Sequence, residues 1–329
     1  MTNIKKLRYA SLWQNRCYKL VRFISTELES KNKTVFFSFL CCGKNKFEKF
    51  KNMIDINKNY NESNLETMAK MPDCFVDLTV TSPPYDGLRT YNGYSFPFED
   101  IAKELFRITK DGGVVVWIVG DATMNGSESG TSFKQALFFK EIGFNLHDTM
   151  IYQKSGAGAV GSNKCYIQNF EYMFVFSKGK IKTTNLIEDR KNKKVCTTIA
   201  NGSRDKNNAD NERKYRTITT KEYGKRFNIW QIEQRNNQDE FHLLHPAPFP
   251  QQLANDHIIS WSNEGDLVYD PFTGSGTTAK MSILNNRNWI GSEISSEYCN
   301  IIEERIKKAW EEKRKEKDLQ AGTLFGDEM

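Results

Sequence analysis

Apolar and polar residues follow a regular rhythm along the chain from Met53 onward. A continuous apolar run over 76–81, stopped by two prolines, predicts a buried strand, and the β-branched run over 114–119 predicts a second. Further strands are expected over 149–153, 172–177, 267–269 and 289–294. Apolar residues at helical spacing predict helices over 64–71, 98–109, 132–142, 251–262, 277–285 and 297–318. Strands that alternate with helices predict an α/β fold built on a layered sheet.

Two segments fall outside this rhythm. Residues 1–52 show little periodicity and are expected to form a basic N-terminal appendage, either disordered or helical over 4–29. Residues 178–226 are polar and rich in Asn and Thr, which is typical of an insertion. We therefore expect a first core part over 53–177, a second core part over 227–318, and a flexible tail over 319–329.

The formal net charge of +6 hides an uneven distribution. The appendage and the insertion each carry a net charge of +9, so the rest of the chain carries −12. Basic segments on an acidic body suggest a polyanionic partner such as nucleic acid. Charge alone is equally compatible with solvated, lysine-rich loops.

The cysteines and histidines argue against metal and disulfide chemistry. The seven cysteines are odd in number and include no C-x-x-C pair, and the four histidines form no H-E-x-x-H pattern. We expect neither a metal site nor a disulfide framework, and a reducing cytoplasm is the simplest location. No run approaches about 18 apolar residues, so no membrane-spanning helix is expected.

A glycine-rich stretch from Asp270 to Thr278 stands where a predicted strand ends and a helix begins. Glycines allow the backbone to approach a ligand closely, and the amides of a helix N-terminus favour negative charge. The spacing matches neither the phosphate loop nor the dinucleotide fingerprint. Glu293, at the end of the next strand, is placed to grip ribose hydroxyls. The residues expected to bind a cofactor are Asp270, Pro271, Phe272, Gly274, Ser275, Gly276, Thr277 and Glu293.

A second candidate site, Ser82-Pro83-Pro84-Tyr85, directly follows the strand predicted over 76–81. Because proline has no amide hydrogen, the segment offers acceptors, namely the Ser82 hydroxyl and the Pro83 carbonyl. Two converging acceptors suit an exocyclic amine, and Tyr85 offers a flat face for a base withdrawn from its stack. A rigid turn without chemistry is the alternative interpretation of this motif alone.

Together, the two motifs resemble those of the β class of DNA amino-methyltransferases, in which the catalytic motif precedes a recognition region and the cofactor motif follows it. The resemblance covers residues 53–310 and includes Tyr298 and Arg305 in the last helix. It implies a doubly wound, mostly parallel, seven-stranded, Rossmann-like sheet with S-adenosylmethionine as cofactor. It also implies that Phe249 lies in a segment leading into the cofactor pocket, and that Glu62 or Ser63 contacts the cofactor adenine.

The activity implied by the resemblance is site-specific transfer of a methyl group to an exocyclic amine of a flipped base. Ser82 and Pro83 would accept the amine hydrogens, and Tyr85, with Tyr91 or Phe96, would stack on the base. Ser at the first motif position favours cytosine N4, with adenine N6 as the alternative. The chain has no Pro-Cys pair, which argues against methylation at cytosine carbon 5.

The insertion lies where the β class keeps its target recognition region, so double-stranded DNA is the expected substrate. The residues expected to bind DNA are Arg190, Lys191, Lys193, Lys194, Arg213, Lys214 and Arg216. The loop over 155–163 is expected either to close over DNA or to act as a plain connector. A cognate restriction endonuclease and a nucleoid-associated location are further expectations from this likeness. The tail over 320–325 resembles peptides that bind the bacterial replication clamp, which implies a contact with that clamp, with a plain chain end as the alternative.

Other functions fit the sequence less well. RNA and protein-glutamine methyltransferases share a similar Pro-Pro-Tyr turn, but they keep the cofactor motif upstream of it, whereas here it lies downstream. An inactive DNA-binding homologue is disfavoured because both motifs are intact, and failure to bind S-adenosylmethionine would support it.

Overall fold

The structure is a computed structural model that describes residues 54–84, 96–155, 166–193, 195, 197–201, 215–233, 239–244 and 250–324. The predicted appendage over 1–52 lies outside these ranges, and so do Tyr85, Tyr91 and Phe249. Within them, none of the helices combines the length and the hydropathy that a membrane crossing requires.

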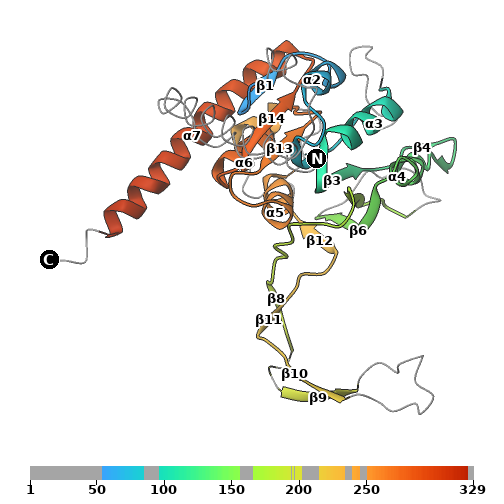
Figure 1. Cartoon of the computed structure of the whole chain (residues 1–329), viewed down its shortest axis with the longest axis vertical. Coiled ribbons are helices and arrows are strands. Elements are labelled where there is room, and N and C mark those ends of the chain that lie inside the picture. Colours follow the sequence, from blue (N-terminus) through green and yellow to red (C-terminus); the bar gives the residue numbers. More distant parts are fainter. Residues whose placement is uncertain are drawn as a thin grey trace, which may run out of the picture. The chain divides into compact units, whose positions relative to one another are not determined.

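An eight-stranded sheet organises the described part of the chain (Figure 1). In spatial order its strands are β1 (Lys58–Tyr60), β14 (Asn288–Ser292), β13 (Leu267–Asp270), β2 (Val76–Thr81), β3 (Thr109–Val119), β7 (Phe170–Ser177), β6 (Asn145–Lys154) and β12 (Ile229–Ile232). Within this sheet β7 is antiparallel to both of its neighbours, and every other pair is parallel. The carboxyl ends of the other seven strands therefore meet at one edge.

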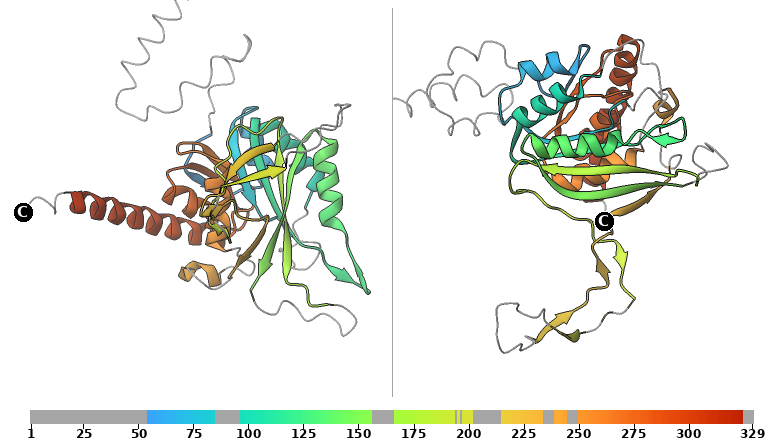
Figure 2. Two further views of the ribbon diagram at one scale, coloured as in Figure 1. Left: turned by 90° about the horizontal axis from the view of Figure 1, so that it is seen from below. Right: turned by 90° about the vertical axis from the view of Figure 1, so that its right-hand side faces the viewer.

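Helices cover both faces of the sheet (Figure 2). On one face lie α2 (Asn64–Lys70), α3 (Phe98–Ile108) and α4 (Thr131–Glu141), whose Met68 and Phe139 join the core around Trp117. On the other face lie α5 (Gln251–Trp261) and α6 (Thr277–Leu284), whose Leu253 and Met281 pack around Val80. α7 (Ser296–Leu324) packs on α6. Because both faces are covered, the central strands are apolar along most of their length, which is why their sequence reads as continuous runs.

The alternation of strands and helices predicted from the sequence is confirmed. The residue pattern located six strands and the resemblance implied seven, whereas the sheet has eight. β1 and β12 join the sheet as well. β1 has three residues, Lys58-Asn59-Tyr60, and no apolar run, and β12 has four residues that alternate between exposed and buried. Strands this short carry too few positions for a periodic signal.

The last helix also extends further than expected. α7 continues to Leu324, whereas the sequence placed its end at Asp318 and a flexible tail after it. The residues after Asp318 are good helix formers, namely Leu319, Gln320 and Ala321, so their propensity favours continuation of the helix.

The insertion forms an antiparallel hairpin, which we call the recognition hairpin. β8 (Arg190–Lys191) pairs with β11 (Tyr223–Gly224), and β9 (Thr197–Asn201) pairs with β10 (Tyr215–Thr219). The second pair lies in the chain between the two strands of the first, as the labels in Figure 1 show. Threonine and isoleucine, which favour strands, recur in the sequences of β9 and β10. Three smaller elements complete the described chain: β4 (Thr123–Met124), β5 (Ser127–Glu128) and the 3₁₀ helix η3 (Glu240–Leu244).

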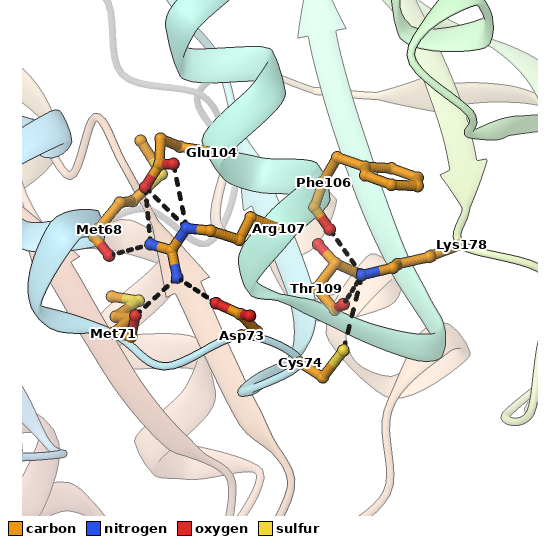
Figure 3. Close-up of polar contacts among 9 residues, drawn as sticks. All are labelled: Met68, Met71, Asp73, Cys74, Glu104, Phe106, Arg107, Thr109 and Lys178. Atoms are coloured by element: carbon orange, nitrogen blue, oxygen red, sulfur yellow. Dashed lines mark hydrogen bonds and ion pairs between the residues drawn. The ribbon is translucent and has the colours of Figure 1, made fainter. Parts of the chain in front are cut away.

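Arg107 fastens α2 to α3 at the amino edge of the sheet, opposite the carboxyl ends of the parallel strands (Figure 3). Its guanidinium donates to the carbonyl of Met68 at 2.6 Å and to that of Met71 at 2.8 Å. It also donates to the carboxylates of Glu104 and Asp73. The carbonyls at the end of a helix lack partners within the helix, so this contact closes the end of α2.

Lys178, which follows β7, closes the end of α3 in the same way (Figure 3). Its Nζ donates to the carbonyls of Phe106 at 2.8 Å and Thr109 at 3.0 Å, and it lies 3.6 Å from Cys74 Sγ. Both cations stabilise the starts of β2 and β3, away from the predicted motifs.

Candidate active site

The carboxyl ends of three neighbouring strands bring the predicted motifs together. β13 lies between β14 and β2, with Tyr269 opposite Thr79. The glycine turn after β13 therefore lies beside the Ser82-Pro83-Pro84 segment after β2, and Glu293 follows β14 on the other side. From β2 the chain continues toward β3, and from β13 it continues toward β14 on the opposite side. This is a topological switch point, the place where open α/β sheets bind their ligands.

Asp270 joins the two motifs through a buried carboxylate. Its Oδ1 accepts hydrogen bonds from Thr81 Oγ1 at 2.7 Å and from the Phe272 amide at 3.0 Å, and its Oδ2 accepts one from Thr278 Oγ1 at 2.7 Å. Burial raises the pKa of this carboxyl, and the hydrogen bonds from Thr278, Thr81 and Phe272 lower it in part. Asp270, which the sequence placed among the cofactor-binding residues, holds the glycine turn against the catalytic segment.

Two glycines allow the turn to fold tightly. Gly276 precedes α6 with a φ of 84°, in the left-handed region that suits glycine. Gly291 in β14 lies directly beneath the turn, because a Cβ there would lie 2.4 Å from Thr273 Oγ1 and 2.6 Å from Asn59 Oδ1. The backbone of the turn can therefore face a ligand closely, which fits a bulky nucleoside cofactor.

Glu293 fixes the rim of the glycine turn. Its Oε2 accepts a hydrogen bond from the Gly274 amide and its Oε1 accepts one from the Ser295 amide, both at 2.9 Å. Burial raises the pKa of the Glu293 carboxyl, while the amides of Ser295 and Gly274 lower it. A half-buried carboxylate held in this position can accept further hydrogen bonds from ribose hydroxyls.

Arg305 of α7 supports the turn from below with a fully buried guanidinium. Its Nη1 donates to the Ser275 carbonyl at 2.9 Å, to Ser275 Oγ at 3.1 Å and to Thr277 Oγ1 at 2.9 Å. Its Nε donates to Asp239 Oδ2 at 2.9 Å. The hydroxyls of Ser275 and Thr277 thus accept hydrogen bonds from Arg305. The resemblance included Arg305 without giving it a role.

The catalytic segment leaves β2 beside Asp270. Thr81 and Pro83 are buried, and Ser82 and Pro84 are half-buried. Tyr85 lies outside the described residues. A buried, rigid Pro83 next to a partly accessible Ser82 presents the acceptors of this segment at a fixed place on the edge of the sheet.

Phe96, one of the residues considered for stacking on a base, packs instead in an aromatic cluster. Its ring lies 5.7 Å from that of Phe272 in the glycine turn and 6.2 Å from that of Phe98. Phe272 in turn lies 6.3 Å from Trp117 in β3. Phe272, predicted to bind the cofactor, is therefore anchored to the core on one side.

Two asparagines that sequence reasoning missed tie the start of α2 to this site. Asn61 Nδ2 donates to the carbonyls of Glu293 at 3.0 Å and Ile294 at 3.1 Å. Asn64 Nδ2 donates to the carbonyl of Pro271 at 3.2 Å. Asn61 lies in a bend and Asn64 is the first residue of α2, and single polar residues at such places give no periodic signal in the sequence.

The two candidates for the adenine contact have other partners. Glu62 accepts a hydrogen bond from Thr67 Oγ1 at 2.9 Å and forms an ion pair with Lys70. The amide of Ser63 donates to Glu66 at 3.0 Å at the start of α2. Both residues therefore order the first turns of α2, beside the segment that carries Asn61.

The residues predicted to bind DNA lie on the recognition hairpin where the structure describes them. Lys191 and Lys193 are exposed, and Arg216 lies in β10. Arg190 donates from Nε to the Lys225 carbonyl at 3.0 Å and lies over the ring of Phe227 at 4.7 Å. Lys194, Arg213 and Lys214 lie outside the described residues.

These features define the class of the protein. A doubly wound, mostly parallel sheet with a glycine turn after β13 and an acid after β14 is the architecture of an α/β enzyme with a nucleoside cofactor. Solved methyltransferases share this fold. The PvuII DNA methyltransferase (cytosine-N4-specific) superposes with a TM-score of 0.57 at 20% identity, covering 77% of this chain and 87% of that one. A DNA modification methylase of Thermus thermophilus, TTHA0409, complexed with S-adenosyl-L-methionine, gives a TM-score of 0.53 at 22% identity, covering 77% and 93%.

Sequence comparison identifies the family. The profile of the DNA methylase family N6_N4_Mtase matches residues 76–304. The orphan methyltransferase M.BamHII of Bacillus amyloliquefaciens is 59% identical over 239 residues, which cover 71% of this chain and 90% of M.BamHII. The type II methyltransferase M.BglII of Bacillus subtilis is 26% identical, over 75% of this chain and 68% of that protein.

The chain therefore belongs to the DNA methylase family. Membership confirms the prediction of a DNA amino-methyltransferase with S-adenosylmethionine as its cofactor.

Proposed function

We propose that the chain transfers a methyl group from S-adenosylmethionine to N4 of a cytosine flipped out of double-stranded DNA at a specific site. The observation that carries this proposal is the hydrogen bond of 2.7 Å between Thr81 and Asp270. It holds the acceptor-rich segment next to the glycine turn, so the amine and the methyl donor are brought to one edge of the sheet. Holding two reactants in register is itself a large part of the catalysis of such a transfer.

The acceptors of the catalytic segment do the chemistry on the amine. The Ser82 hydroxyl and the Pro83 carbonyl accept its two hydrogens, which takes the nitrogen lone pair out of conjugation with the ring. The lone pair would then form the new bond to the methyl carbon while the bond from that carbon to sulfur breaks, so that the thioether leaves with the bonding electrons. The methylated nitrogen would give up one of its two protons to solvent. This is catalysis by position and by acceptor electrostatics, and it needs no covalent intermediate with the protein.

The glycine turn and Glu293 are the residues that would hold the cofactor, which supplies an electrophilic methyl group when bound. The backbone of Gly274 to Gly276 faces the ligand, and the Glu293 carboxylate accepts hydrogen bonds from the ribose. Asp270 and Arg305 keep the turn in place from the buried side. Phe249 belongs to the segment that leads into the cofactor pocket in this proposal.

Removing a base from the duplex stack costs a few kcal/mol, which contacts with the protein must offset. Stacking on an aromatic ring contributes about 1–3 kcal/mol per base, and Tyr85 is the ring that follows the acceptors in the chain. Ser82 at the first position of the motif supports cytosine N4 as the target, and adenine N6 is the alternative outcome.

The recognition hairpin supplies DNA contacts in this proposal. Phosphate contacts by Lys191, Lys193 and the other predicted cations fix the register of the protein on the duplex. Arginines such as Arg216 suit bidentate reading of guanine. The basic appendage over 1–52 would add further attraction to the phosphates.

Partners beyond DNA are secondary parts of the proposal. A cognate restriction endonuclease is supported by the type II names of relatives that are 24–27% identical, and opposed by the orphan name of M.BamHII. A clamp contact through residues 320–325 requires Gln320 to Leu324 to leave α7, which holds them in a helix. A nucleoid-associated location in the cytoplasm follows from action on DNA.

Expression in a host without DNA methylation tests the proposal. The host DNA is digested to nucleosides, which are identified by mass spectrometry, and the modified positions are mapped. We expect N4-methylcytosine at one short sequence. N6-methyladenine would reverse the choice of base, and unmodified DNA would refute the function. Pro83→Ala serves as the control, since it should abolish modification while binding of S-adenosylmethionine persists.

A further inference from the structure

The recognition hairpin is attached to the rest of the protein through two chain segments. We call residues 187–192 the first stem and residues 222–226 the second stem. Main-chain hydrogen bonds join them, from the Asn192 amide to the Glu222 carbonyl at 2.8 Å and from the Arg226 amide to the Ile187 carbonyl at 2.9 Å. β8 and β11 contribute two residues each. A two-stranded ribbon this short is only marginally stable alone, so its direction must be fixed by contacts at its base.

The Arg226 guanidinium makes these contacts. Its Nε donates to Asp189 Oδ2 at 2.9 Å, on the first stem, and its Nη1 donates to Asp256 Oδ2 at 2.6 Å, on α5. The Asp256 side chain is 7% exposed and that of Arg226 is 23% exposed. Arg226, on the second stem, thus binds both the first stem and α5. Charge-assisted hydrogen bonds of this kind are stronger than neutral ones, and the planar arginine fork makes them directional.

The surface beneath Arg226 belongs to the packed core. The guanidinium lies 5.1 Å from the ring centre of Trp230 in β12, which stacks on His257 of α5 at 4.5 Å. His257 Nδ1 accepts a hydrogen bond from Trp261 Nε1 at 3.2 Å, so its proton lies on Nε2, which is 3.2 Å from Met173 Sδ. Trp230 and His257 are both buried, so Arg226 lies against a packed part of the core.

We propose that Arg226 is a positioning residue for DNA recognition, which fixes the direction of the recognition hairpin relative to α5 and hence to the methyl-transfer edge. The inference rests on the proposed function, because it assigns the hairpin to DNA. Arg226 acts through Asp189 and Asp256, and it touches neither the base nor the cofactor.

Geometry explains why the base of the hairpin matters. The stretch from Arg190 to Ile199 spans up to roughly 30 Å when extended, at about 3.3 Å per residue. A rotation of 10° at the stems would then move the far strands by roughly 5 Å, which exceeds the spacing of about 3.4 Å between successive base pairs. Loss of the Arg226 contacts would therefore shift the hairpin out of register with the target.

The test compares Arg226→Gln, Arg226→Lys and Asp256→Asn with Glu188→Gln. The last variant is the matched control, because Lys221 forms an ion pair with Glu188 in the same hairpin, but both side chains are largely exposed (74% and 41%). Once the target has been mapped for the wild type, KM for a target duplex, kcat at saturating DNA, the dissociation constant of S-adenosylmethionine and Tm are measured. A duplex with one changed base pair in the target measures discrimination.

We expect Arg226→Gln to raise KM for the target at least about tenfold and to lower discrimination, with kcat and cofactor affinity within about twofold of wild type. Arg226→Lys keeps the charge but loses the planar guanidinium, so its KM should lie between those of the wild type and Arg226→Gln. Arg226→Gln combined with Asp256→Asn should resemble the more affected single variant, because the two residues act as one unit. Glu188→Gln, which breaks the exposed ion pair with Lys221 and removes no cation, should match the wild type.

Three results would overturn the inference. The first is an unchanged KM in folded Arg226→Gln, and the second is an equal effect of Glu188→Gln. The third is a loss of cofactor affinity and kcat that parallels the fall in Tm, which would indicate a purely structural role. If Arg226→Gln does not fold, Arg226→Lys and Asp256→Asn carry the same comparison. A wild type that modifies no DNA would refute the proposed function itself, whereas an active wild type with unaffected variants would refute this inference alone.

Discussion

Thr79 and Thr81 stand two positions apart on β2, both fully buried, yet their hydroxyls have different surroundings. Thr81 Oγ1 donates to Asp270 Oδ1 at 2.7 Å, whereas Thr79 Oγ1 has no hydrogen-bond partner among the described residues. The two threonines therefore allow the link between the motifs to be tested against a matched position in the same strand.

Thr81→Val should lower the free energy of unfolding by about 1–3 kcal/mol, because it leaves a buried carboxylate oxygen with one donor fewer. Methyl transfer should fall with it, since the catalytic segment loses its tie to the glycine turn. Thr79→Val should be neutral or stabilising, because it replaces an unpaired hydroxyl with a methyl group. Chemical denaturation and a methyl-transfer assay measure both. Equal effects at the two positions would contradict the role given to Thr81.

His257 gives a prediction for pH. Burial, together with the positive charge of Arg226, lowers its pKa from the ordinary value of 6.5 to about 3. Below 6.5 the unfolded chain takes up a proton that the folded chain does not, so the stability from neutral His257 is present above that pH and is lost as the pH falls. The loss is about 1.4 kcal/mol per pH unit, or roughly 2 kcal/mol between pH 6.5 and 5.

His257→Gln should remove this part of the pH dependence while keeping an acceptor near Trp261. Unfolding free energies of the wild type and the variant, measured at pH 7, 6 and 5, should converge as the pH falls. Parallel curves would show that His257 titrates normally in the folded protein.

At the scale of elements, apolar continuity determined what the sequence could predict. β2 was predicted with the correct bounds, because a strand buried on both faces reads as an unbroken apolar run. β1 was missed, since its three residues are ordered by pairing with β14 and not by their own pattern. The order of the strands sets the link between Thr81 and Asp270, which are 189 positions apart, and no local pattern encodes such a contact.

The site likewise contains residues that the sequence could predict and residues that it could not. The motifs placed the glycine turn and the Ser82-Pro83-Pro84 segment, because glycine and proline carry backbone information in the sequence itself. The roles of Asp270, Ser275 and Thr277 as internal supports could not be predicted, since they depend on Thr81 and Arg305 arriving from distant elements.

Arg107 is predicted to stabilise the packing of α2 on α3 without affecting catalysis. Arg107→Met leaves the carbonyls of Met68 and Met71 without their hydrogen-bond donor. Each partly buried carbonyl that loses its donor lowers the free energy of unfolding by about 1–3 kcal/mol. Thermal and chemical denaturation should show the loss, with kcat unchanged below the melting range.

Lys103 provides the control on the same helix. Its pairs with Glu99 at 3.6 Å and Asp100 at 4.0 Å are exposed, so Lys103→Gln should change stability by less than about 0.5 kcal/mol. A Lys103 effect as large as that of Arg107 would show that helix charge, not the clamp at the end of α2, stabilises this region.

At the scale of the whole molecule, the recognition hairpin and the sheet are predicted to be separable in function. Lys191 pairs with Tyr223, so residues 193–221 can be replaced by a short Asn-Gly turn that keeps the stems in register. The shortened chain should fold and bind S-adenosylmethionine as the wild type does, and its methylation of target DNA should fall at least about a hundredfold as phosphate contacts are lost. Retained methylation at the same sequence would place recognition outside the hairpin.

The account depends most on the claim that the edge formed by β13 and β2 moves a methyl group from S-adenosylmethionine to an exocyclic amine of DNA. The most direct measurement incubates the purified protein with deuterium-labelled S-adenosylmethionine and unmethylated duplex DNA, then identifies the labelled nucleoside by mass spectrometry. The account predicts labelled N4-methylcytosine with the wild type and none with Pro83→Ala. Unlabelled DNA from a folded wild-type protein that binds the cofactor would contradict it.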